Sequence, residues 1–259
     1  MKFEFKSEST KPFVDWLKSN VSPNKEVLLH MRDNKFFVMS CHGNKSAIKY
    51  SEKLFNEVGL TPINKNPEIG KGVMIGLFNV YTFIKYIEYF KDKDYNMSIN
   101  FDLVNDEVWG NSYAATSIVL KSADDKDAKI TCKCAKLNSF IYLTKEKYTS
   151  ICDDIVKKSR FCTDIEVNGI EKILQLCALD DITNTVAFKY GEGFKIVGET
   201  FEYVINTTGS ADIQGGINID KKYIKVIDID KYKIYIDSNR LLFYNENSSL
   251  LIGGITNNG

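Results

Sequence analysis

The alternation of apolar and polar positions along this chain repeats one unit four times: a short amphipathic helix followed by a strand hairpin. Apolar residues recur every three or four positions in segments that begin near Thr10, Asn79, Asn168 and Asp220, which is the period of a helix with one buried face. Alternating apolar segments follow each helix and predict hairpins at about 26–41, 97–120, 183–200 and 231–253. Both halves of the chain therefore share the order helix, hairpin, helix, hairpin, without residue-by-residue identity between them.

Polar residues at the expected helix starts support this division. Asn79 and Asp220 precede their helices as N-caps, and Asn168 with Glu171 three residues later is a variant of the capping box. The first helix has Thr10 as a cap candidate and Pro12 in its first turn, where a missing N–H costs nothing. Each helix is thus expected to begin close to a residue that can satisfy its free amides.

Two segments are less regular. Residues 51–72 contain several glycines and prolines and are predicted to form loops. In the middle of the chain, 130–143 has an extended pattern and 145–158 has helical spacing. We therefore expect an N-terminal domain at 1–129, a connector at 130–163 and a C-terminal domain at 164–259.

Composition indicates a globular chain. Hydrophobic residues make up 44% of the sequence, including 16 Phe and 14 Tyr, and there are only 4 Pro. The first residues have no apolar stretch typical of a signal peptide, and no run of about 18 apolar residues predicts a membrane span. A soluble, cytoplasmic protein whose six cysteines are reduced thiols is the expectation.

No pattern in the sequence predicts catalysis or metal binding. Phosphate-binding glycine loops are absent, and Gly191-Glu192-Gly193 is predicted to be a hairpin turn. Cys41 and His42 are adjacent in a predicted strand, so their side chains point to opposite faces. Cys132 and Cys134 share a face but lack two further ligands, and the pairs Asp124-Asp125 and Asp153-Asp154 are interpreted as solvated surface charge. No catalytic residue, metal or cofactor is expected.

Lysines on the outer sides of the predicted helices are the candidate site. Net charge is zero, with 34 basic and 34 acidic residues, which gives no whole-protein argument for nucleic-acid binding. A lysine opposite an apolar stripe is ordinarily a solvated residue, but the pattern recurs on four helices. If those faces line one surface, they would contact phosphates without reading bases. The candidate residues are Lys11, Lys18, Lys85, Lys91, Lys172, Lys221, Lys222 and Lys225.

With these elements in place, the chain resembles a DNA sliding clamp, and most of all the clamps of tailed phages. The resemblance rests on the order of elements in four stretches that cover about three quarters of the chain: FVMSCHGNKSAIKY (37–50), the helix at 79–90 with the strands after it, DIEVNGIEKILQLCALDDITNTVAFKYGEGFKIVGET (164–200), and INIDKKYIKVIDIDKYKIYIDSNRLLFYNENSSLLIGGI (217–255). Residues 51–72 and 130–160 are longer than the family pattern.

The resemblance implies an α+β fold of two similar clamp-type domains, each with two helices packed on antiparallel sheets, that assembles into a ring. It further implies a homotrimer that encircles double-stranded DNA without sequence preference, and DNA polymerase and a clamp loader as partners. The helix lysines would line the hole, while acidic residues outside would balance their charge.

Two other readings of the residues remain open at this stage. The chain could be a non-enzymatic phage structural or assembly protein with no DNA role, in which case the lysines would be scattered. It could also be an enzyme that uses Asp, Tyr and Lys residues in no recognisable motif, although no nucleophile–base pair is visible.

Overall fold

The computed structural model describes residues 1–21, 25–42, 46–64, 72–91, 93–106, 110–123, 128–140, 143–205 and 214–255. The chain divides into two compact units. Unit 1 comprises Met1–Ser40 and Tyr50–Tyr142, and unit 2 comprises Cys41–Lys49 and Leu143–Gly259.

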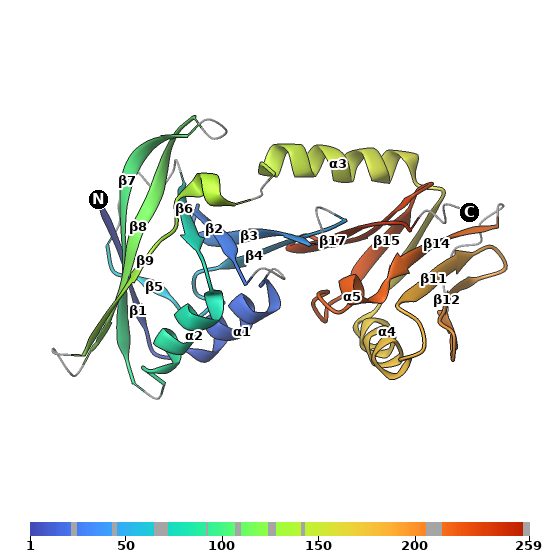
Figure 1. Cartoon of the computed structure of the whole chain (residues 1–259), viewed down its shortest axis with the longest axis horizontal. Coiled ribbons are helices and arrows are strands. Elements are labelled where there is room, and N and C mark those ends of the chain that lie inside the picture. Colours follow the sequence, from blue (N-terminus) through green and yellow to red (C-terminus); the bar gives the residue numbers. More distant parts are fainter. Residues whose placement is uncertain are drawn as a thin grey trace. The chain divides into compact units, whose positions relative to one another are not determined.

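Unit 1 combines one large sheet with two helices (Figure 1). Its elements are β1 (Lys2–Ser7), α1 (Lys11–Ser19), β2 (Val27–Arg32), β3 (Lys35–His42), β4 (Ala47–Leu54), β5 (Thr61–Pro62), β6 (Val73–Leu77), α2 (Val80–Glu88), β7 (Tyr95–Asp106), β8 (Gly110–Ser122), β9 (Lys129–Lys133) and a 3-10 turn at Leu137–Ser139. Strands β3 and β4 each contribute residues to both units.

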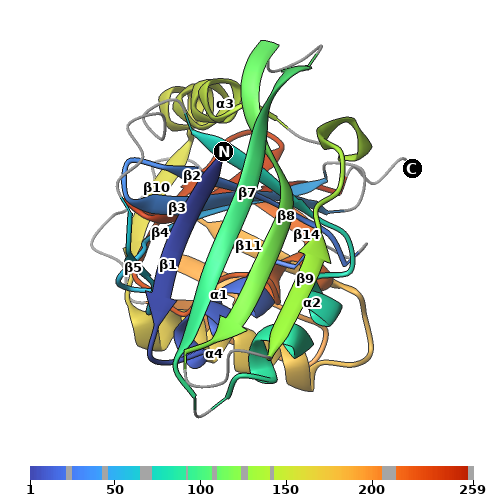
Figure 2. The same ribbon diagram turned by 90° about the vertical axis from the view of Figure 1, so that its left-hand side faces the viewer.

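The strands of unit 1 follow the order β5-β1-β7-β8-β6-β2-β3, and β9 pairs with β8. Pairing is antiparallel except between β6 and β8, which run parallel. Figure 2 shows β1, β7, β8 and β9 as one neighbouring set, with β9 on the outside.

The helices α1 and α2 bury their apolar faces in the main core of unit 1. Leu17 and Ile87 are fully buried in it, and Phe13 and Phe83 are almost so. Trp16 is also buried, and its indole Nε1 donates a hydrogen bond to Ser51 Oγ at 3.0 Å. Burying such side chains supplies most of the stability of short helices like these, because an isolated helix of this length is marginal in water.

Among the described residues, unit 2 has one four-stranded sheet, four strands of a thirteen-stranded sheet, and three helices. Its elements are α3 (Lys145–Lys158), β10 (Phe161–Ile165), α4 (Val167–Leu179), β11 (Thr185–Tyr190), β12 (Phe194–Val197), β13 (Glu202–Ile205), β14 (Gly215–Asp220), α5 (Lys221–Ile224), β15 (Tyr232–Ile236), β16 (Arg240–Tyr244) and β17 (Ser248–Gly253). The four-stranded sheet has the order β13-β12-β11-β14, and the strands of the larger sheet follow the order β10-β15-β16-β17, with β17 paired to β4. The core between them includes Ile170, Ile173 and Cys177 of α4 and Ile224 of α5.

The predicted sequence of helices and hairpins is confirmed. The four helices begin at Lys11, Val80, Val167 and Lys221, each within one residue of the predicted position. The segment at 145–158, which had helical spacing, is the helix α3, and Thr144 caps it by accepting a hydrogen bond from the Lys147 amide at 3.3 Å.

Three of the four predicted caps make no side-chain capping bond. Thr10 occupies the N-cap position of α1 without such a bond, and Asn79 occupies that of α2 with a left-handed backbone, φ 52°, and likewise without one. Asn168 lies inside α4, and Glu166 takes the N-cap position without a side-chain bond. The predicted cap at Asp220 is confirmed, because its Oδ1 accepts a hydrogen bond from the Lys222 amide at 3.0 Å.

The prediction that 51–72 forms loops is partly wrong. Strand β4 continues to Leu54 and β5 occupies Thr61–Pro62. The strand periodicity of β4 was hidden because its residues Ala47 to Glu52 are all buried, so polar and apolar residues do not alternate between core and solvent.

Candidate nucleic-acid interface

The paired helices of unit 1 carry four of the lysines identified in the sequence. The helices α1 and α2 lie side by side, and Lys18 Nζ of α1 is 3.0 Å from Glu88 Oε1 of α2 (Figure 1). Lys11, Lys85 and Lys91 are exposed and form no ion pair with any residue that the structure describes. This helix pair therefore presents solvated, uncompensated cations.

The paired helices α4 and α5 carry the other four lysines. Lys172 on α4 and Lys225 at the end of α5 are exposed. Lys222 is exposed as well, and its Nζ lies 2.5 Å from Asp220 Oδ2 and 4.7 Å from the centre of the Tyr223 ring. The hydrogen bond to Asp220 raises the pKa of Lys222, so this side chain stays positively charged.

Lys221 has a different environment from the other seven. Its side chain is 7% exposed, its Nζ lies 3.3 Å from Asp180 Oδ2, and it also donates a hydrogen bond to the Asp180 carbonyl. Asp180 is wholly buried, and although burial opposes ionisation, hydrogen bonds from Lys221 and the Glu199 amide hold the pKa of Asp180 below its usual value. Lys221 is therefore a structural residue that joins the end of α4 to α5, and its ammonium is not accessible to a phosphate.

The sequence pattern predicted that Lys221 is exposed because the prediction treated α5 as a longer helix than it is. This helix is a single turn, so its first residue lies at the junction with β14 and not on a regular helical face. The Lys221 amide bonds to the Asn184 carbonyl, which orients the residue inward. Helical phase alone could not predict this.

Two residues with exposed side chains on α2 were not identified from the sequence. Tyr81 and Tyr89 are 45% and 65% exposed and stand four residues to either side of Lys85. Their spacing is visible in the sequence, but tyrosines carry no charge and so do not belong to the pattern of lysines. They give the outer face of α2 an aromatic character.

The two histidines are buried, and the Cys134 thiol is half-buried. Burial lowers the pKa of His42 to about 4 and that of His30 to about 3, so both imidazoles are neutral at pH 7. Burial raises the pKa of the Cys134 thiol to about 12, which disfavours a metal-binding thiolate. Within the described ranges, no three His, Cys, Asp or Glu residues group as a metal site.

Of the two carboxylate pairs, Asp153-Asp154 lies within the described residues. Asp154 lies 2.8 Å from Lys158 Nζ and 2.9 Å from Arg240 Nη2, so it is part of a surface ion-pair network. Asp153 is exposed. Asp124 and Asp125 lie outside the described residues.

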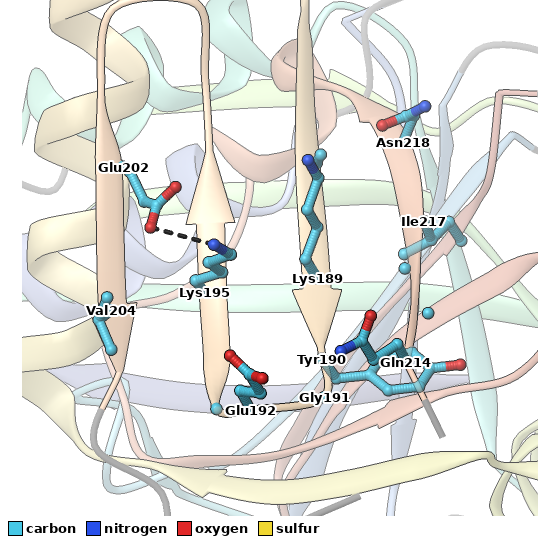
Figure 3. A pocket seen from close by; sticks show the side chains of 14 residues that line it. Lys189, Tyr190, Gly191, Glu192, Lys195, Glu202, Val204, Gln214, Ile217 and Asn218 are labelled. Atoms are coloured by element: carbon cyan, nitrogen blue, oxygen red, sulfur yellow. Dashed lines mark hydrogen bonds and ion pairs between the residues drawn. The ribbon is translucent and has the colours of Figure 1, made fainter. Parts of the chain in front are cut away.

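A shallow basin of about 750 Å³ lies on the exposed face of the sheet β13-β12-β11-β14 (Figure 3). Lys189 and Lys195 are directly opposite each other on β11 and β12, and Lys195 Nζ lies 3.1 Å from Glu202 Oε1. The charges of the basin are thus partly compensated internally.

None of the helices of the described chain is long and apolar enough to cross a membrane.

Solved structures show which class of protein has this architecture. The chain superposes on the β chain of DNA polymerase III from Streptococcus pneumoniae with a TM-score of 0.65 and 15% identity, over 100% of this chain and 66% of that one. The Helicobacter pylori β clamp bound to a DNA ligase peptide gives 0.64 and 11%, over 100% and 68%. The A. fulgidus PCNA bound to the C-terminal region of FEN-1 gives 0.62 and 12%, over 99% and 100%.

The chain therefore has the DNA sliding-clamp fold, as the resemblance in the sequence predicted. It spans about two thirds of the length of the bacterial clamps and the whole of the archaeal one. No protein-family model and no curated protein matches the sequence.

Proposed function

We propose that this protein is a sliding clamp: a non-enzymatic ring that encircles double-stranded DNA and tethers a replicative DNA polymerase to raise its processivity. The observation that carries the proposal is the clamp fold over the whole chain. Exposed lysines on the helix pairs α1–α2 and α4–α5 support it, because a ring that slides needs long-range attraction to phosphates without base contacts.

The proposed DNA-facing residues are seven of the eight lysines. Lys221 is left out because its ammonium is buried against Asp180. The remaining residues are Lys11, Lys18, Lys85, Lys91, Lys172, Lys222 and Lys225.

The proposed assembly is a homotrimer closed by strand pairing between copies. Strand β13 is the last strand of its sheet, and β9 pairs with β8 along one side. Both edges can accept a further strand, and an unpaired edge in a monomer invites such pairing. Lys129 and Lys133 on β9 are exposed cations, whereas the exposed Glu202 on β13 already lies 3.1 Å from Lys195 Nζ, so the β9 edge is basic and the charge of Glu202 is partly compensated.

The proposed partners are a DNA polymerase and a clamp loader, in the cytoplasm, and an origin in a tailed phage stays a prediction. Two of the similar clamps are bound to segments of other proteins, a DNA ligase peptide and the C-terminal region of FEN-1. These complexes support docking of DNA-processing proteins on this chain.

The test is duplex DNA binding by charge-reversal variants. We expect the double variant Lys222→Glu and Lys225→Glu to bind a fluorescent duplex of about 40 bp at least about tenfold more weakly at low salt, because two phosphate contacts are replaced by repulsion. Fluorescence anisotropy over a salt series would measure this, with circular dichroism as the check on folding.

The matched control is Lys147→Glu with Lys157→Glu, which makes the same change in net charge on α3. We expect this variant to bind DNA nearly as well as the wild type. Equal loss in both variants would mean that only net charge matters, and no binding by the wild-type protein would favour a structural protein without a DNA role.

A further inference from the structure

The outer face of α2 has a composition that the clamp proposal does not explain. Tyr81, Lys85 and Tyr89 succeed each other at intervals of four residues and so lie along one stripe, about 6 Å apart along the helix axis. The neighbouring Glu88 forms an ion pair with Lys18 of α1. The stripe is therefore a cation between two exposed tyrosines.

These tyrosines lie outside the core of unit 1. The inner face of α2 already fills the core of unit 1 with Val80, Phe83, Ile84 and Ile87. Among the helices that the structure describes, only α2 exposes large aromatic side chains. Both tyrosines are exposed, and neither hydroxyl has a hydrogen-bond partner among the described residues, so both tips are accessible to a ligand.

Charge indicates which ligand fits this stripe. Lys85 and Lys91 on α2 and its C-terminal turn, and Lys11 on the neighbouring α1, are exposed cations without an acidic partner in the described chain. Such a surface attracts a polyanion. Tyrosine side chains are regular donors to phosphate oxygens, because the ring supports a polar tip at the border between protein and water.

We propose that Tyr81 and Tyr89 are DNA-contacting residues whose hydroxyls donate hydrogen bonds to phosphate oxygens on either side of the phosphate that Lys85 attracts. This inference rests on the proposed function and extends it to uncharged groups. A hydroxyl contact displaces no counterion, so it orients the duplex relative to α2 without adding to the electrostatic grip that would slow sliding.

The experiment compares Tyr81→Phe, Tyr89→Phe and the double variant in the full-length protein. Phe keeps the ring and removes only the hydroxyl. We expect affinity for the duplex to fall about threefold for each single variant and about tenfold for the double variant. A loss of this size is what the removal of one hydrogen bond usually causes. The slope of log K against log salt should stay unchanged, whereas Lys85→Gln should reduce it by about 0.9.

Tyr244→Phe is the matched control, because Tyr244 is 43% exposed but lies on the strand β16. It should bind DNA as the wild type does. Unchanged affinity in the Tyr81 and Tyr89 variants, or an equal loss in the Tyr244 variant, would overturn the inference.

Two further outcomes separate the inference from the clamp proposal. If Phe variants bind normally and only Tyr81→Ala and Tyr89→Ala bind weakly, the rings rather than the hydroxyls make the contact, and the inference fails while DNA binding stands. If the wild-type protein binds no duplex, the clamp proposal fails together with the inference.

Discussion

The buried ion pair of Lys221 and Asp180 shows that one lysine can be buried while its neighbours in sequence are exposed. The three lysines Lys221, Lys222 and Lys225 have the same side chain and lie within five positions, yet one is a core residue and two are exposed. Asp180 Oδ1 has no geometric hydrogen-bond partner among the described residues, so its carboxylate depends mainly on Lys221, with the backbone amides of Glu199 and Ile182 contributing. A buried carboxylate with so few partners cannot tolerate the loss of its cation.

We predict that Lys221→Met lowers the free energy of unfolding by about 3–5 kcal/mol, because it leaves the Asp180 carboxylate buried and unpaired. Urea unfolding at pH 7 would measure the difference. Lys222→Met is the control and should change stability by less than about 1 kcal/mol, since its ion pair is exposed.

The pH dependence gives a second check on the same pair. Because the pKa of Asp180 is lowered in the folded protein, the stabilisation is present at neutral pH and is lost as the pH falls below about 4, the value of an unfolded aspartate. The difference between wild type and Lys221→Met should therefore shrink in acid. A difference that stays constant down to pH 3 would mean that the pair is not the cause.

At the scale of elements, helix starts were predicted better than helix caps. Apolar spacing located all four helices, since that spacing follows from the face that each must bury. The reason for each starting residue differs, however. Asp220 caps α5 through its side chain, while Asn79 enters α2 with a left-handed backbone, and both are residues that a sequence pattern treats alike.

We predict that Asp220→Ala lowers the free energy of unfolding by about 1 kcal/mol, because the Lys222 amide loses its acceptor. Asn79→Gly should cost little or nothing, as glycine adopts the left-handed conformation freely. Chemical denaturation of both variants would compare them. Equal losses would show that Asn79 also acts through its side chain.

Strands were predicted less completely than helices. The hairpins β2–β3 and β11–β12 were predicted because their turns contain Asp33-Asn34 and Gly191-Glu192-Gly193, residue types that favour tight turns. The structure shows why: Asp33 and Asn34 have φ values of 51° and 62°, and Gly191 and Gly193 also have positive φ. Strands β10, β13 and β14 were not predicted. Strands β10 and β14 pair with β15 and β11, which are distant in sequence, so no hairpin turn marks those pairs. Strand β13 pairs with its neighbour β12 across residues 198–201, a connection that the sequence pattern did not reveal.

At the scale of the whole molecule, the clamp proposal makes a definite statement about mass. We predict a native mass of about 88.5 kDa, three times the 29.5 kDa of one chain, in light scattering at micromolar concentration. The double variant Lys129→Glu with Lys133→Glu should shift the mass towards 29.5 kDa, because two carboxylates on β9 would then face Glu202 of the proposed interface in place of two cations.

The α3 variant Lys147→Glu with Lys157→Glu serves here as well and should keep the trimer mass. A wild-type protein that is monomeric at every concentration would contradict the stable trimer. A β9 variant that stays trimeric would place the contact between copies elsewhere than on β9.

The sequence by itself determined the repeated order of helices and hairpins, and with it the likeness to the clamp fold. Those features depend on local periodicity, which each segment carries in its own residues. Only the tertiary structure decided that Lys221 is buried while Lys222 and Lys225 are exposed, and that Tyr81 and Tyr89 have free hydroxyls beside Lys85. The environment of a side chain depends on segments distant along the chain, such as Asp180 at the end of α4, and no local pattern contains that information.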